Sequence, residues 1–170
     1  MKKSVSYWIT SAIVLMGAVN LTSCKDDEDP EPQVMSRTYD LSPVSDPSIS
    51  GQVTFTKIDA SSTLILIELE GTTAGNTHPA HIHANSASEG GSIVIGLSSV
   101  DGATGMSETT ITQEDDGTPI TYEGLLTYDG YVNVHLSPSA LSTLIAQGNI
   151  GSNDAGNPGA GPLSGDGDGY

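Results

Sequence analysis

The chain is poor in cysteine, in aromatic residues and in basic residues, and each shortage excludes something. Its 170 residues include a single cysteine, Cys24, so an intramolecular disulfide is excluded. The only tryptophan and the only phenylalanine are Trp8 and Phe55, so a folded core must be built mainly from valine, isoleucine and leucine. Five basic residues stand against 21 acidic ones, giving a net charge of −16. Such a charge repels nucleic acid and anionic lipid headgroups, so we expect no nucleic-acid partner.

The chain also lacks an apolar run long enough to span a bilayer. The longest run, residues 9–19, follows a short basic start and precedes Leu-Thr-Ser-Cys at residues 21–24, as in a secretory signal. This string resembles the lipobox of bacterial lipoproteins, in which the cysteine becomes the first mature residue and carries the lipid. The resemblance implies a signal peptide over residues 1–23 and a lipid anchor at Cys24 in the outer membrane. An ordinary signal peptide with an incidental thiol is the alternative.

Both ends of the expected mature chain have compositions that cannot bury apolar area. Residues 24–36 contain an acidic, proline-containing stretch, so we predict a flexible tether there. The stretch also resembles the acidic export signal of surface lipoproteins in Bacteroidetes-type bacteria, although it could be a simple spacer. Residues 154–170, rich in glycine and aspartate, predict a flexible tail. Without residues 1–23 the net charge is −18, which would attract cations.

Residues 37–153 have the pattern of a single β domain. Residues 51–58 alternate polar and apolar, as in a half-buried strand, and residues 63–70 form a more apolar strand after a four-residue turn. Further strands are predicted at residues 78–83, 92–97, 107–113, 130–136 and 145–150. Residues 120–126 fit either a strand or a short helical turn, and residues 138–144 fit a helical turn. Short strands with turns at this spacing predict an antiparallel sandwich or small barrel.

The histidines are the main candidates for chemistry. His78, His81 and His83 lie within six residues, and His135 ends the string Tyr-Val-Asn-Val-His. Because side chains alternate along a strand, His81 and His83 point to one face while Ile82 points to the core. If the two strands are neighbours, His81, His83 and His135 converge on one metal ion. His78 is a weaker candidate, either as an outer ligand or as a group that caps the backbone.

Imidazole nitrogen suits copper, zinc and nickel, and three histidines with an open position are also typical of catalytic zinc. The predicted cofactor is therefore one copper or zinc ion. The alternative is that the histidines are structural and donate their ring N–H groups to backbone carbonyls. Asp115 and Asp116 precede Gly117 in what we interpret as a plain turn. No string resembles a nucleophile elbow or a phosphate-binding loop.

Several strings together resemble the CHRD domain, a module first named from chordin. They are His78–His83, Glu89–Gly91, Tyr131–His135 and Ile145–Gly151. Their order and spacing match that family over about residues 50–153. The same stretch is similar, more distantly, to the copper/zinc superoxide dismutases, in which His81, His83 and His135 would correspond to copper ligands. The resemblance implies a Greek-key β-sandwich.

The similarity to the dismutases is incomplete. Residues 85–91 supply none of the bridging and zinc-binding histidines of those enzymes. The half-cystine of their closing strand corresponds to Gln147, and the arginine that attracts superoxide, expected near Leu144, is absent. Such a site would be at most a copper half-site.

These observations favour a binding module without enzymatic activity. We expect a lipid-anchored CHRD-domain lipoprotein of the cell envelope, exposed at the surface or facing the periplasm, that binds a metal ion, an extracellular protein or a glycan. One alternative is a copper-only oxidoreductase similar to superoxide dismutase, although the missing arginine and the negative charge argue against rapid capture of an anionic substrate. The other is a structural or adhesive surface domain.

Overall fold

The computed structural model describes residues 34–154, which form one antiparallel β domain with a single short helix. The expected signal peptide (residues 1–23), the lipidation site Cys24, most of the tether and most of the tail lie outside the described residues. The elements in chain order are β1 (Ser36–Pro43), β2 (Ser50–Lys57), β3 (Thr63–Glu70), β4 (Thr77–Ala84), β5 (Ile93–Asp101), β6 (Met106–Ile111), α1 (Tyr122–Leu126), β7 (Asp129–His135) and β8 (Leu144–Gly151).

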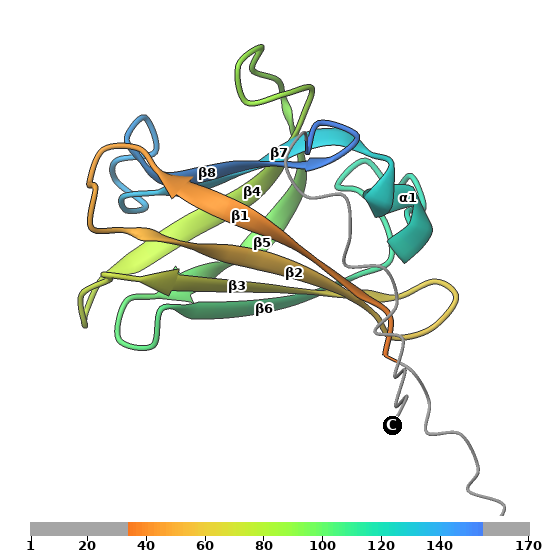
Figure 1. Ribbon diagram of the computed structural model, residues 1–170, viewed down its shortest axis with the longest axis horizontal. Helices are drawn as coiled ribbons and strands as arrows, with labels where there is room; N and C mark the ends of the chain where they lie inside the picture. The colour runs from red at the N-terminus through yellow and green to blue at the C-terminus, as the bar shows by residue number, and fades with distance from the viewer. Residues whose placement is uncertain (1–33, 155–170) are drawn as a thin grey trace, which may run out of the picture. The chain divides into compact units, whose positions relative to one another are not determined.

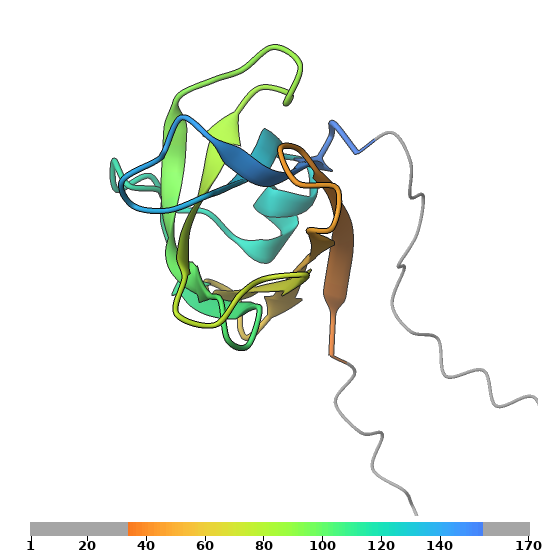
Figure 2. The ribbon, with the colours of Figure 1, turned by 90° about the vertical axis from the view of Figure 1, so that its left-hand side faces the viewer.

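The eight strands close into one barrel, in the order β1-β2-β3-β6-β5-β4-β7-β8 (Figures 1 and 2). All neighbouring strands are antiparallel, as the sequence predicted. The ring is closed because β5 pairs with β6 and β1 pairs with β8. These two contacts are short: β5–β6 has one residue pair and β1–β8 has two.

The barrel interior is almost wholly aliphatic, which follows from the alternation of side chains along each strand. In β3, Ile65 and Ile67 are 1% and 0% exposed while their neighbours face outward. Phe55 of β2 is fully buried and its ring lies 5.3 Å from that of Tyr39. Each such large side chain contributes about 1.5–3 kcal/mol when fully buried. These contacts supply a core without any disulfide.

The structure differs from the sequence-based expectations at three places. β1 was not predicted, because only Tyr39 and Leu41 of its eight residues are buried in the core. No helix forms between residues 138 and 144, where the chain makes turns before β8. The strand predicted at residues 130–136 ends at His135, after an irregularity between Val134 and His135, and Leu136 beyond it is 42% exposed.

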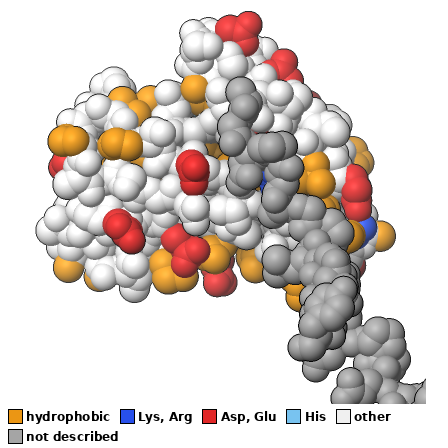
Figure 3. Space-filling model, viewed as in Figure 1, with side chains coloured by type: hydrophobic (Ala, Val, Ile, Leu, Met, Phe, Trp, Pro, Cys, Tyr) orange, Lys and Arg blue, Asp and Glu red, His pale blue; other side chains and the backbone are white. Residues whose placement is uncertain are grey.

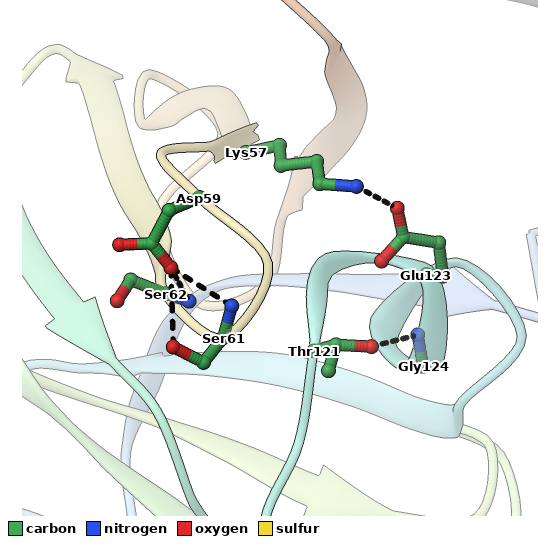
Figure 4. A network of polar contacts seen from close by, with 7 residues as sticks. All are labelled: Lys57, Asp59, Ser61, Ser62, Thr121, Glu123 and Gly124. Carbon is green, nitrogen blue, oxygen red and sulfur yellow. Dashed lines mark hydrogen bonds and ion pairs between the residues drawn. The ribbon is translucent and has the colours of Figure 1, made fainter.

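The segment that fitted either a strand or a helical turn is the helix α1, which lies at one end of the barrel (Figure 1). Thr121 precedes it, and its hydroxyl accepts a hydrogen bond from the backbone N–H of Gly124, as is typical of an N-cap (Figure 4). Leu125 is fully buried. Glu123 pairs with Lys57 at the end of β2, which connects the helix to the barrel wall (Figure 4).

The surface of the described part is strongly acidic. Residues 34–154 contain two basic residues, Arg37 and Lys57, and both are paired, with Asp154 and Glu123 respectively. Figure 3 shows one face of the molecule, on which acidic side chains are scattered and basic ones are nearly absent. Such a surface raises the local concentration of cations. Within residues 34–154, no helix is long and apolar enough to cross a bilayer.

Candidate metal centre

The pairing of β4 with β7 brings the two histidine-containing segments together. His81 lies opposite Asn133, and His83 lies opposite Tyr131. Ala80 and Ile82 point into the barrel and are fully buried. His81 and His83 therefore lie on the outer face of the sheet, as the alternation rule predicted, and His135 at the end of β7 joins them there.

One ring nitrogen from each of His81, His83 and His135 lies within 4.8 Å of the other two. His81 Nδ1 and His135 Nε2 lie 3.1 Å apart. Two nitrogens bound to a tetrahedral ion at about 2.05 Å would lie about 3.4 Å apart. The pair from His81 and His135 is therefore close to the required spacing, and the nitrogen of His83, within 4.8 Å of the others, needs to approach by at most about 1.4 Å. The three histidines could hold one metal ion.

Backbone carbonyls determine which nitrogen of two of these rings is available. The Nδ1 of His135 lies 2.6 Å from the carbonyl oxygen of Leu141, and the Nδ1 of His83 lies 3.0 Å from that of Gly91. Because a carbonyl can only accept, each Nδ1 carries the hydrogen and each Nε2 keeps its lone pair. Hydrogen bonds of this kind, made by the ring nitrogen that does not bind the metal, orient the histidine ligands of many metal sites.

The loop that supplies the carbonyl of Gly91 is held close to the end of β4. A Cβ atom at Gly91 would lie 1.9 Å from the carbonyl oxygen of Ala84, so only glycine fits this approach. The backbone N–H of Gly91 donates to the hydroxyl of Tyr131 at 3.1 Å. The ring of Tyr131 also stacks on that of His83, with centroids 4.9 Å apart and an interplanar angle of 21°. The Gly91 peptide and the His83 ring are thus fixed by the same neighbour.

Two of the histidines have lowered pKa values, which favours the neutral form that a metal ligand requires. Burial lowers the pKa of His81, and the nearby rings of His135 and His83 lower it further, while Asp115 acts in the opposite direction. Burial also lowers the pKa of His135, although its hydrogen bond to Leu141 opposes this. Both rings therefore present lone pairs at neutral pH.

His78 is not part of this group. It lies on the inner side of β4, 1% exposed. Its Nδ1 lies 2.9 Å from the carbonyl oxygen of Leu136 and 3.2 Å from that of His135, to which it donates. Its Nε2 is buried without a hydrogen-bonding partner in the described part of the chain. Of the two roles considered for His78, the structure favours the backbone cap, since it holds the end of β7 where His135 is located.

Two further residues at the site were not identified from the sequence. Asn133, 6% exposed, lies opposite His81 and two residues before His135, with its Nδ2 atom 3.5 Å from His83 Nε2. Alternation along β7 puts Asn133 on the same face as His135, but its contacts depend on a residue of β8. Gln147 Nε2 donates to Asn133 Oδ1 at 2.8 Å.

The second of these residues is Asp115, which the sequence placed in a plain turn. Both of its carboxylate oxygens lie 3.1 Å from the backbone nitrogen of Gly96, which pairs with His81 across β4 and β5. The carboxylate lies 3.7 Å from where a Cβ of Gly96 would be. It therefore covers the outer edge of β5 and places a negative charge near His81.

Comparisons with known proteins do not assign the chain to a family. The CHRD and dismutase resemblances therefore stay expectations from the sequence. No family model matches the chain, and neither the search of curated proteins nor the search of solved structures found a match.

Proposed function

We propose that this protein is a non-enzymatic binding module that holds one transition-metal ion through His81, His83 and His135. The observation that carries the proposal is the convergence of three ring nitrogens, supplied by two strands distant in sequence, within 4.8 Å of one another. A histidine with a purely structural role can satisfy its ring N–H on a backbone carbonyl without placing its other nitrogen beside two further imidazoles. His78 is an example of that other role in the same fold.

The ligand set favours copper or zinc. Three imidazoles suit both ions, and the affinity of nitrogen sites for divalent first-row metals is highest for copper. Backbone carbonyls at the Nδ1 atoms of His83 and His135 support the proposal, because they leave Nε2 as the ligand atom. The acidic surface would concentrate cations near the site without selecting among them.

The proposal includes a Greek-key β-sandwich of the kind that the CHRD and dismutase resemblances imply. The strand order supports it, because β3 and β7 flank the consecutive strands β4, β5 and β6. The two shortest contacts, β5–β6 and β1–β8, divide the ring into two groups of four strands. Those groups, β1-β2-β3-β6 and β5-β4-β7-β8, would be the two layers of the sandwich.

The cellular setting of the proposal comes from the sequence. We propose a CHRD-domain lipoprotein anchored through a lipid on Cys24 in the outer membrane of the cell envelope. The lipobox-like string and the acidic stretch after it support this assignment. Labelling of the expressed protein with a radioactive fatty acid tests it, and a Cys24→Ala variant that is still labelled would contradict it.

Thermal unfolding with copper or zinc tests the metal site. An ion that binds only the folded state at a hundredfold excess over its Kd stabilises that state by about 2.7 kcal/mol. For a domain of this size the melting temperature should then rise by about 10 °C. The double variant His81→Ala/His83→Ala should lose this response. His78→Asn, which removes an imidazole outside the group, should retain it.

Two results would contradict the proposal. One is the absence of any copper- or zinc-dependent shift in the wild-type protein. The other is an equal shift in the double variant, provided that its circular dichroism spectrum shows that it is folded. A superoxide assay on the copper-loaded protein separates a binding module from an oxidoreductase, because a binding module should be no more active than copper bound to a simple peptide.

A further inference from the structure

The amide of Asn133 lies among the three histidines of the proposed metal site. Asn133 is opposite His81 in the β4–β7 pairing and two residues before His135 on β7. Its Nδ2 atom is 3.5 Å from the Nε2 of His83. At 6% exposure, this side chain is nearly excluded from water. A buried amide at this position must find its hydrogen-bonding partners among neighbouring protein groups or a bound ligand, because water does not reach it.

The orientation of this amide follows from its neighbours. The carbonyl of Gly91 requires a hydrogen on His83 Nδ1, so His83 Nε2 is an acceptor and cannot donate to an amide oxygen. Asn133 must therefore direct its NH₂ group, and not its oxygen, towards His83. The oxygen faces the other way and accepts from Gln147 Nε2 at 2.8 Å. Gln147 on β8 thus fixes which end of the Asn133 amide enters the site.

A metal ion at the site would leave this amide without an acceptor. The contact with His83 Nε2 is long for a hydrogen bond, and it is the one acceptor within 3.5 Å of Asn133 Nδ2 among residues 34–154. Coordination would occupy the lone pair of that nitrogen. A buried N–H group without an acceptor is unfavourable, and a charged acceptor satisfies it better than a neutral one.

We propose that Asn133 makes the open coordination position of the metal selective for a carboxylate ligand. One carboxylate oxygen would occupy that position, and the other would accept a hydrogen bond from Asn133 Nδ2. A ligand that has no acceptor beyond its coordinating atom gains nothing from the amide. This inference rests on the proposed metal site, and it adds the chemical class of the ligand which that site accepts.

Titration of the copper-loaded protein with two small ligands tests the inference. Formate has a second oxygen that can accept from Asn133, whereas imidazole, once coordinated, offers only an N–H group. Binding of each is followed by visible absorption and electron paramagnetic resonance of the copper. In Asn133→Leu the affinity for formate should fall about tenfold or more, as for loss of a hydrogen bond to a charged group. The affinity for imidazole should stay within about twofold.

A second substitution covers the case in which leucine disturbs the site. Asn133→Val also lacks a donor but is smaller than leucine, so formate binding should again be weakened while imidazole binding remains. Asn153→Leu, an asparagine whose amide contacts Asp129 and Gly130 instead of the histidines, is the matched control and should bind both ligands as the wild type does.

The outcomes separate this inference from the proposed function. If the wild-type protein binds neither copper nor zinc, the proposed function fails and this inference fails with it. If copper binds but formate affinity is the same in the wild type and in Asn133→Leu, only the inference is overturned. A parallel loss of formate and imidazole in both Asn133 variants also overturns it, since the amide would then act on the metal site as a whole.

Discussion

Replacing Gly91 by alanine tests whether the loop between β4 and β5 positions His83 for metal binding. The added Cβ would lie 1.9 Å from the carbonyl oxygen of Ala84, whereas real contacts of this kind are about 3 Å or longer. The backbone of the variant must therefore shift by about 1 Å. A shift of that size extends the 3.0 Å contact between Gly91 and His83 Nδ1 beyond hydrogen-bonding distance.

Two effects should follow from the loss of this contact. The free energy of unfolding should fall by about 1–3 kcal/mol, because a buried hydrogen bond is broken. The affinity for copper should fall about 10- to 100-fold, which is typical when a metal-binding histidine loses the hydrogen-bonding partner of its other ring nitrogen. Urea unfolding of the metal-free protein measures the first quantity, and competitive copper titration measures the second.

The neighbouring glycine supplies a matched control. Gly90 has a backbone φ of +74°, but a Cβ there would meet no atom within 4 Å. Gly90→Ala should therefore cost about 1 kcal/mol of stability through its left-handed conformation and leave copper affinity unchanged. Equal copper affinities in Gly91→Ala and the wild type, or equal losses in both glycine variants, would refute this account of the loop.

Two further predictions follow from the histidines. His78→Leu should lower the free energy of unfolding by about 1–3 kcal/mol in urea titration, because the buried carbonyl of His135 and the partly buried carbonyl of Leu136 lose their donor. His78→Asn, which keeps an N–H group near the same place, should recover part of this loss, and equal losses would contradict the cap. Stability should also fall as pH drops below about 6.5, because the lowered pKa values of His81 and His135 mean that the unfolded chain binds more protons there. Urea unfolding at several pH values should show this decline in the wild type and a weaker one in a His81→Gln variant; equal declines would contradict it.

The sequence predicted those parts of the fold in which alternation is clean and long. Residues 63–70 form β3 with the predicted boundaries, because four of their eight side chains are buried in strict alternation. β1 could not be recognised, since two buried side chains among polar residues do not make a distinctive pattern. Closure of the barrel could not be predicted either, because it depends on contacts such as Asp101 with Met106 and Pro43 with Ala146. No local pattern encodes these pairings.

The same distinction applies to the candidate site. The period of two along a strand was sufficient to place His81 and His83 on one face, and the structure brings His135 beside them. The sequence could not decide between the two roles considered for His78, an outer ligand or a backbone cap, because its inward orientation and its contacts with the end of β7 depend on the placed strands. The contacts of Asn133 also escaped prediction, because they depend on Gln147 in a strand that comes later in the chain. Residues that act through a neighbouring strand become visible only when the strands are placed.

The single residue pair between β5 and β6 has a consequence for how the molecule fluctuates. Partial opening requires the fewest hydrogen bonds to break at this junction, so backbone amides beside it should exchange with solvent sooner than those in the centre of the sheet. The histidines lie elsewhere, on β4 and β7, which are joined by five residue pairs. The barrel could therefore open transiently on one side while a bound ion stays coordinated, because the ion would cross-link two strands that lie away from this junction.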